Sequence, residues 1–385
     1  MRKTINIGDL GTIITGKTPP TTNKNYYGDY AVFIKPTDIS EHSKYTYETE
    51  EMYSKLAAEK YESSLIPKGA ICVPCIGTIG TKMTMAPCDC YTNQSINSII
   101  CNENYDNEYV YYLIKKFLPG LKAYNLGTAS GREYVSKSNF EKIELVAEQD
   151  KEIQKKIGVI LSRYDSLIEN YQKQIKLLEE AAQRLYKEWF VDLRFPGHEN
   201  TNIIDGVPEG WEMKKVGEIA IISAGGDKPD VVTEEQTTEC QVPIYSNGTT
   251  KEGLYGYTNK SSNTAGSITV SARGSIGFAC LRMHDYFSIV RLISIKPQNN
   301  VDLMYLFQFT KVHTFMSNGA AQQQLTVPMV KAIDVVYPAE SLLEAFENVV
   351  LPLYKKVQSL QSQLRLLTEA RDRLLPKLMS GEITV

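Results

Sequence analysis

The chain has 385 residues, with 42 basic and 45 acidic side chains and a formal charge of −3. This length allows two or three domains, and the charge excludes a protein that is strongly basic overall. No apolar run is as long as a membrane span, and the first residues, MRKTINIGDL, lack the apolar region of a secretory signal. We therefore expect a globular, cytoplasmic protein.

Residues 1–147 are predicted to form the first globular domain, of mixed α/β type. Its strand-like segments are TINIGDLGTII, AVFIKPTDIS, GAICVPCIGTIG, SINSIIC and FEKIELV. The segment KTPPTTNKNYYGDY is a loop by its Pro, Thr and Asn content, and NEYVYYLIKKFL is typical of a helix. A polar loop, AYNLGTASGREYVS, follows that helix.

Two motifs in this domain suggest other functions. GTIITGKT matches the phosphate-binding P-loop pattern, but Pro19 and Pro20 follow where that motif needs a helix. We expect a turn with Lys17 exposed and no nucleotide site. Five of the seven cysteines could bind zinc or could be small buried strand residues, and we favour burial because Thr269 and Ala272 stand at matching places later in the chain. These cysteines are Cys72, Cys75, Cys88, Cys90 and Cys101.

Residues 148–195 are predicted to form a long helix with a coiled-coil seam. Apolar residues recur in steps of four and three, which places them on one face of a helix, and charged residues lie between them. The seam consists of Ile157, Leu161, Tyr164, Ile168, Tyr171, Ile175, Leu178, Ala182, Leu185 and Trp189.

Residues 196–206 have the Gly, Pro and Asn content of a linker, and residues 207–339 repeat the order of the first domain. VGEIAIISAGG corresponds to IGDLGTIITGK, and GSITVSARGSIG corresponds to GAICVPCIGTIG with its glycines in step. DLMYLFQFTKV corresponds to the Tyr-rich helix. The chain is therefore predicted to be a duplication.

Residues 340–385 are predicted to contain the second long helix. Its seam follows the first at a constant offset of 189 residues, and only Arg371, opposite Ala182, is not apolar. Pro352 suggests that the firm helix begins or kinks there. The seam consists of Phe346, Val350, Leu353, Val357, Leu360, Leu364, Leu367, Arg371, Leu374 and Leu378.

Two helices of equal length and identical phase favour an intramolecular coiled coil over two separate amphipathic helices. We expect them to be antiparallel, with a pseudo-twofold arrangement of the two domains. If each seam, from its first to its last residue, lies on a straight helix, it spans about 48 Å, which is the length of roughly 14 base pairs of DNA.

Catalytic constellations are missing from the sequence. The four histidines, His42, His198, His284 and His313, lie in no recognisable motif. HExxH, GxSxG, GxGxxG and the methyltransferase motif N-P-P-[YF] do not occur. Nothing in the sequence indicates an enzyme.

The chain resembles the specificity subunits of type I restriction-modification systems over nearly its whole length. The resemblance rests on the order globule, long helix, globule, long helix. It also rests on VPEGWEMKKVGEI, IGTIG and RGSIG, YTNQSIN, RLYKEWF and RDRLLPKLMSGEI. The first half departs from the second because it lacks the VPEGW opening.

This resemblance implies two target-recognition domains that each read one half of a bipartite, asymmetric DNA site, with the coiled coil as spacer. It implies two methyltransferase subunits, which carry S-adenosylmethionine and methylate adenine, and restriction subunits that use ATP and Mg as partners. The chain itself would be a non-catalytic prokaryotic protein with no cofactor, metal or membrane attachment. Because neither domain is basic by composition, we expect partners to supply much of the DNA affinity.

The chemistry of DNA recognition suggests which side chains touch DNA. Arg pairs bidentately with guanine, Asn and Gln pair with adenine, and Lys contacts phosphates. In the first domain we predict Lys17, Lys35, Thr78, Lys82, Asn93, Gln94 and Arg132. In the second we predict Lys228, Asn247, Arg273, Ser275, Gln322, Gln323 and Gln324. The alternative is a coiled-coil scaffold without DNA readout, which would not need such side chains at equivalent loops of both domains.

Overall fold

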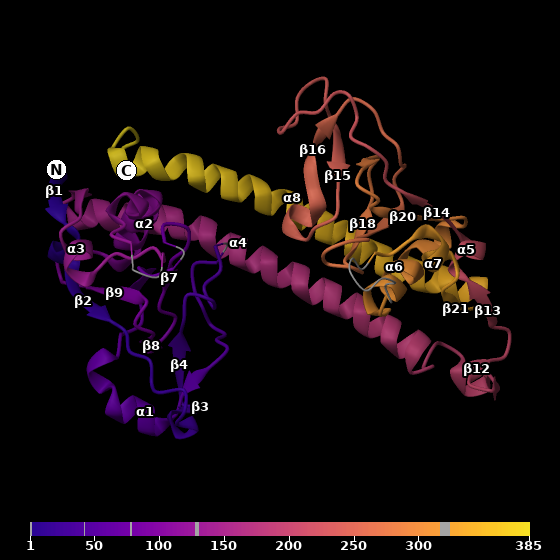
Figure 1. Ribbon diagram of the computed structural model, residues 1–385, viewed down its shortest axis with the longest axis horizontal. Coiled ribbons are helices and arrows are strands. Elements are labelled where there is room, and N and C mark those ends of the chain that lie inside the picture. Colours follow the sequence, from indigo (N-terminus) through magenta and orange to yellow (C-terminus); the bar gives the residue numbers. More distant parts are fainter. Residues whose placement is uncertain (1, 42, 78, 128–130, 316–323) are drawn as a thin grey trace. The chain divides into compact units, whose positions relative to one another are not determined.

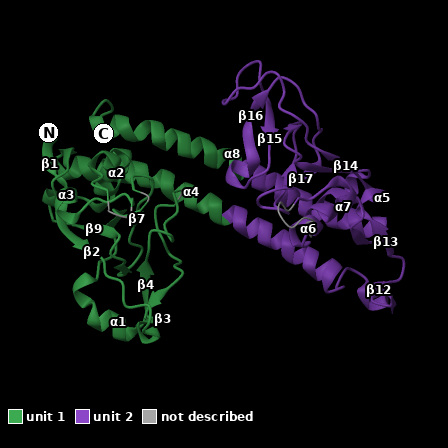
Figure 2. Ribbon diagram, viewed as in Figure 1, with its two compact units in different colours: residues 1–173, 360–385 green, residues 174–359 purple. Residues whose placement is uncertain are grey.

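The computed structural model describes residues 2–41, 43–77, 79–127, 131–315 and 324–385 (Figure 1). The chain divides into two compact units. One contains residues 1–173 and 360–385, and the other contains residues 174–359 (Figure 2). The predicted mixed α+β architecture, with two sheet-rich domains and long helices, is confirmed.

Unit 1 is built on small, mostly antiparallel sheets. Its first and last strands, β1 (Arg2–Asn6) and β10 (Glu144–Glu148), pair with each other. One sheet has the order β2-β9-β6-β7, with strands Gly11–Thr15, Ile96–Cys101, Ile71–Pro74 and Thr84–Met85. The other has the order β3-β5-β4-β8, with strands Tyr27–Gly28, Met52–Tyr53, Ala31–Ile34 and Tyr91–Thr92, of which β4 and β8 are parallel. The short helices are α1 (Lys55–Lys60), α2 (Asn107–Phe117) and α3 (Lys137–Glu141).

Unit 2 repeats this plan. Strands β13 (Glu212–Lys215) and β21 (Asp334–Tyr337) pair as β1 and β10 do. One sheet has the order β14-β20-β17-β18, with strands Ala220–Ala224, Ile293–Pro297, Ser267–Val270 and Ala279–Arg282. The other has the order β16-β15-β19, with strands Leu254–Thr258, Val242–Tyr245 and Phe287–Ser288. The short helices are α5 (Val216–Ile219), α6 (Leu303–Val312) and α7 (Val327–Lys331), and a hairpin of β11 (Ile203–Ile204) and β12 (Val207–Pro208) precedes them.

The long helices are α4 (Lys151–Tyr186), which ends in a π-helical turn (Lys187–Val191), and α8 (Glu340–Ser380). Within each unit the stretches of α4 and α8 run in opposite directions (Figure 1). A helix start at Pro352 is wrong, because α8 already begins at Glu340. Proline removes one backbone donor and leaves the carbonyl of Asn348 without its helical partner. Both residues are exposed, so water can satisfy that carbonyl.

Each unit buries its stretch of the two long helices in its own core. In unit 1, Ile157 and Leu161 of α4 and Leu378 of α8 pack in one cluster with the tyrosines of α2. In unit 2, Tyr186 of α4 and Phe346 of α8 pack in one cluster with α6. The core of each unit therefore depends on both long helices.

Candidate nucleic-acid interface

In unit 1, a glycine loop crosses the turn that follows β8. The turn is closed by a hydrogen bond of 3.1 Å from Ile96 N–H to the Asn93 carbonyl. Gly16 lies against it so closely that a Cβ would come within 2.1 Å of the Thr92 carbonyl oxygen. The next residue, Lys17, donates its N–H to that oxygen at 2.9 Å. Glycine is needed at this crossing, and it brings the loop of Lys17 onto the turn that carries Gln94.

Two further loops of unit 1 join this crossing. The turn after β6 begins at Cys75, whose N–H donates to the Ser95 carbonyl at 2.7 Å. Glu133 holds the same turn, because its carbonyl oxygen accepts from Gly77 N–H at 3.0 Å and its carboxylate accepts from Ile79 N–H at 3.1 Å. Backbone bonds therefore connect the loops that carry Lys17, Gln94 and Arg132.

Unit 2 contains the same crossing of loops. Gly225 lies against the turn after β19, where a Cβ would come within 2.7 Å of the Ile289 nitrogen. That turn is closed by Leu292 N–H donating to the Ile289 carbonyl at 3.1 Å. The turn after β17 meets the loop before α7, where Arg273 donates to the Gln324 side-chain oxygen at 2.9 Å. Two of the predicted DNA-contacting residues are thus in direct contact.

Asn247 links the loops of unit 2 through its side chain. Its amide nitrogen donates to the Val290 carbonyl at 2.7 Å, and its amide oxygen accepts from Ala272 N–H at 2.7 Å. In unit 1 the place of Ala272 belongs to Cys75, whose N–H is satisfied by a backbone carbonyl instead. Asn247 was predicted to read a base, but both polar ends of its amide are directed at the backbone.

The predicted DNA-contacting residues of unit 1 differ in how exposed their side chains are. Lys17 is exposed and its ammonium lies 3.3 Å from the Ser63 hydroxyl. Gln94 is exposed and accepts a hydrogen bond from Thr18, whereas Lys82 and Asn93 are half-buried and Arg132 is exposed. Thr78 lies outside the described residues.

Lys35 is held by two carboxylates. Its ammonium lies 2.7 Å from Glu50 and 3.1 Å from Glu51. Burial lowers the pKa of Lys35, and the hydrogen bonds to the two carboxylates outweigh it and raise that pKa. A phosphate would have to compete with both acids for this lysine.

In unit 2, Lys228 is exposed, with its ammonium 4.6 Å from the centre of the Tyr255 ring. Arg273 and Ser275 are exposed and Gln324 is half-buried. Gln322 and Gln323 lie outside the described residues.

The predicted coiled-coil core is buried to varying degrees. Fully buried positions are Ile157, Leu161, Ile168, Val350, Val357, Leu360 and Leu378. Half-buried positions are Tyr164, Ile175, Leu178, Leu185, Trp189, Leu353, Leu364, Leu367 and Leu374. None of these predicted seam residues is exposed, so the seam of each long helix faces inward within its unit.

The competing motifs have structural explanations. The P-loop-like segment forms strand β2, and no helix begins at Lys17 in the described chain. Burial raises the pKa of Cys72 and Cys75 to about 12, which disfavours the thiolate that a metal needs. Over the described residues no group of three or more His, Cys, Asp or Glu side chains could hold a metal ion. Nor is any described helix long and apolar enough to cross a membrane.

Sequence reasoning missed two features of these loops. Glu133 was not singled out, because an acidic residue gave no DNA-binding signal, yet it fixes the turn beside Arg132. The turn of Val290 and Arg291 was also missed, although Asn93 and Gln94, two residues of the equivalent turn in unit 1, were chosen. Aligning YTNQSIN with FSIVRLI would have found it.

Comparisons with known proteins agree with this architecture. The family model described as type I restriction modification DNA specificity domain matches residues 2–180 and 208–341. The MjaIX specificity subunit of Methanocaldococcus jannaschii is 26% identical over 98% of this chain and 93% of its own length. The HindI specificity subunit of Haemophilus influenzae is 38% identical over 41% of this chain and 35% of its own.

A solved structure has the same fold. The crystal structure of an S subunit from M. genitalium covers 98% of this chain and 96% of its own, with a TM-score of 0.66 and 18% identity. At this identity the likeness concerns the fold. The predicted resemblance is confirmed by the family model and the relatives.

Proposed function

Because the chain belongs to the type I restriction-modification DNA specificity family, we propose that each sheet-rich domain reads one half of a bipartite, asymmetric DNA site. The long helices act as the spacer that sets the unread gap between the half-sites. The chain directs adenine methylation and restriction, and its partner subunits perform both reactions.

The observation that carries this proposal is the repeated crossing of loops. Each unit places a glycine loop against a turn, at Gly16 in one and Gly225 in the other. The side chains on these loops differ: Gln94 and Ser95 occupy the turn of unit 1, and Val290 and Arg291 occupy that of unit 2. Two similar scaffolds that carry different side chains on equivalent turns suit the reading of two different half-sites.

The partners follow from the same proposal. Two methyltransferase subunits with S-adenosylmethionine, and restriction subunits with ATP and Mg, assemble with this chain in the prokaryotic cytoplasm. The chain itself is non-catalytic and needs no cofactor. Neutralisation of phosphates by basic side chains supplies much of the affinity of a protein for DNA. Because this chain has a net charge of −3, we expect its partners to supply part of that affinity.

The test is to express this chain with the methyltransferase subunit of its system and to map N6-methyladenine in the host DNA. We expect a bipartite motif that disappears when this gene alone is removed. A verified complex with an active methyltransferase and no motif would contradict the proposal and favour a scaffold without DNA readout.

A further inference from the structure

The turn that follows β19 has an unusual backbone for its residues. Val290 and Arg291 both lie in the left-handed region, with φ of 53° and 61°, and Leu292 N–H closes the turn on Ile289. Two consecutive left-handed residues with this closing bond form a type I′ turn, which strongly favours Asn-Gly. A β-branched valine at such a position is strained.

Burial of these side chains does not compensate the strain. Val290 is 44% exposed, and Arg291 is also exposed. The backbone around them holds the turn instead: Val290 N–H donates to the Gly226 carbonyl and Arg291 N–H donates to the Gly225 carbonyl, each within 2.9 Å. The side-chain amide of Asn247 also donates to the Val290 carbonyl. Strain that the surroundings enforce at exposed residues is typical of a functional site.

A second strained loop adjoins this turn through Asn247. Lys251 and Glu252 are left-handed, with φ of 47° and 54°, and both are exposed. Thus four of the six non-glycine residues with positive φ in the described part of the chain belong to two loops, and Asn247, which lies on the loop of Lys251 and Glu252, joins them by its hydrogen bond to the Val290 carbonyl. Chain connectivity alone does not explain such clustering, since the two loops are far apart in sequence.

A buried arginine, Arg282, binds the loop of Lys251 and Glu252. Arg282 is 2% exposed, donates to the Glu252 carbonyl at 2.6 Å and lies 3.3 Å from the Glu252 carboxylate. Its guanidinium also packs 3.6 Å from the centre of the Tyr245 ring. The carboxylate of Glu252 is therefore paired with a cation from the core, which leaves the charge of neighbouring Lys251 less compensated at the surface.

We propose that Arg291 and Lys251 are DNA-contacting residues of the second domain, and that the half-site it reads depends on Arg291. This rests on the proposed function and names residues for it. Arg291 and Arg273 lie on loops that Asn247 ties together, so the two guanidinium groups can act on one stretch of duplex. The equivalent turn in unit 1 carries Gln94 and Ser95, which would give that domain a different base preference.

The main test replaces the turn by its preferred residues, with Val290→Asn and Arg291→Gly together. Asn-Gly suits a type I′ turn, so we expect Tm to stay the same or rise, while the guanidinium is lost. The complex of this chain with its methyltransferase subunit is titrated against duplexes that carry the methylome-defined site. We expect binding to weaken about 5-fold to 150-fold, with changed preference at the second half-site alone.

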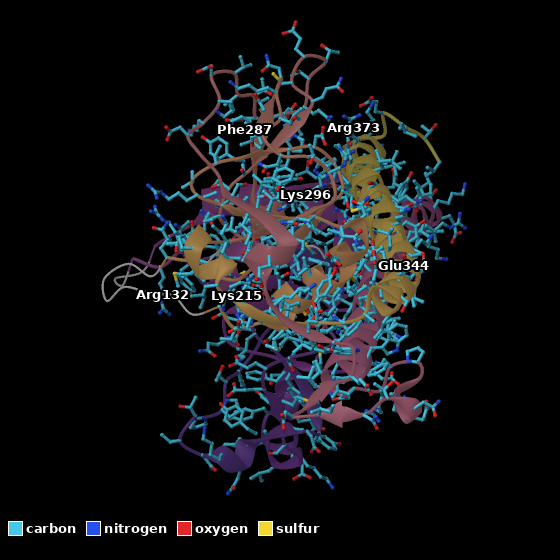
Figure 3. The ribbon with its side chains drawn as sticks, turned by 90° about the vertical axis from the view of Figure 1, so that its right-hand side faces the viewer. Arg132, Lys215, Phe287, Lys296, Glu344 and Arg373 are labelled. Atoms are coloured by element: carbon cyan, nitrogen blue, oxygen red, sulfur yellow. The ribbon has the colours of Figure 1, made fainter. Side chains whose placement is uncertain are left out.

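A second variant, Lys251→Gly, also relieves a left-handed residue and removes one charge. If Lys251 touches a phosphate, the slope of log Kd against log salt should fall by about 0.9. The control is Lys215→Ala, because Lys215 lies in the same unit, pairs with Asp334 at 2.8 Å, and lies well away from Phe287 of β19 (Figure 3). It should leave binding and specificity unchanged.

The possible outcomes distinguish the roles of Arg291 and Lys251 from the proposed function itself. Wild-type binding to the site, with unchanged affinity and half-site preference in the Asn-Gly variant, would overturn the role of Arg291 and leave the proposed function standing. An unchanged salt slope and affinity in Lys251→Gly would remove Lys251. A wild-type complex that binds no defined duplex would overturn the proposed function and this assignment with it.

Discussion

Gly158 and Glu347 stand at matching places on the two long helices. Each lies beside the N-terminus of a short helix, and that N-terminus is capped differently in the two units. In unit 1, Asp106 caps α2 by accepting from Tyr109 N–H at 3.0 Å, and Gly158 lets α4 approach: a Cβ there would lie 3.0 Å from the Asp106 carboxylate. In unit 2, the carboxylate of Glu347 itself caps α6 by accepting from Met304 N–H at 2.9 Å. The side-chain oxygen of an acidic residue on a long helix thus replaces a local cap.

Glu347 should make the stability of unit 2 depend on pH. Burial raises its pKa to about 7 from 4.5, although the hydrogen bond from Met304 lowers it. The folded chain therefore binds more protons than the unfolded chain between these values, so the free energy of unfolding falls as pH rises through this window. Glu347→Gln keeps an acceptor for Met304 and removes the titration, so its Tm should vary less between pH 4.5 and 7.

The control for this prediction is Glu344→Gln, an exposed position one turn earlier on α8 (Figure 3). Its Tm profile should follow that of the wild type. Thermal unfolding by circular dichroism across the pH series measures both variants. Parallel profiles for the wild type and Glu347→Gln would show that Glu347 ionises normally in the folded chain.

At the residue scale, side-chain chemistry alone does not reveal which contacts a single residue makes in the folded chain. Asn247 was chosen as a base reader, but its amide is used to hold the backbone together. The turn of Val290 and Arg291 carried no turn signal, because its backbone conformation contradicts the preferences of its residues. Such positions are set by tertiary contacts, which a sequence pattern does not contain.

At the scale of elements, the polar residue in the second heptad seam belongs to a buried network of unit 1. Arg371 donates to the Asp165 carboxylate at 2.5 Å, and Tyr112 of α2 donates to the same carboxylate at 2.5 Å. In unit 2 the matching places hold Ala182, Tyr354 and Gln308, where Gln308 donates to the Tyr354 hydroxyl at 2.9 Å. The charged network of one unit is thus replaced by a neutral pair in the other.

Removing one member of the charged network should be costly. Arg371→Ala leaves the carboxylate of Asp165 buried with Tyr112 and with Lys115, 4.0 Å away. We expect the free energy of unfolding of unit 1 to fall by about 3 kcal/mol, because the buried carboxylate loses its hydrogen-bonded guanidinium and only the more distant Lys115 remains. Denaturant titration, with hydrogen exchange of residues 360–380 as the local probe, measures the loss.

The double variant Asp165→Asn with Arg371→Leu removes both charges and should recover at least half of that loss. As the matched control, Gln308→Ala in unit 2 breaks a neutral bond and should cost about 1 kcal/mol. A single and a double variant of equal stability would mean that the two charges are not coupled.

The long helices were the most predictable elements. Steps of four and three over ten positions favour a helix whatever the surroundings, and both helices have the expected phase. The expectation that proline marks a helix start failed at Pro352. Pro352 and Asn348 are both exposed, so the missing backbone hydrogen bond can be replaced by water. The pairing of β4 with β8 and of β15 with β19 in parallel was not predicted, since short strands far apart in sequence leave no periodic signal.

At the scale of the whole molecule, the duplication joins the two units through shared helices. α4 supplies its first part to unit 1 and its last part to unit 2, and α8 does so in the opposite order. Neither core is complete with one half of the chain, because each cluster contains residues of both long helices. Each unit therefore needs both parts of the chain to complete its core, and a change in helix length must be made in both helices to keep the seams matched.

This requirement gives a test of the spacer. Seven residues of heptad sequence inserted after Lys173 in α4 and after Ser359 in α8, at the borders of the units, keep the phase of both seams. The added length is about 10.5 Å, or roughly three base pairs. We expect the methylome motif to keep both half-sites and to show a wider gap. Insertion in α8 alone should mismatch the seams and abolish methylation. If the paired insertion left an active complex with the original gap, the helices would not set the spacing, and the distance between half-sites would have to be fixed by the partner subunits.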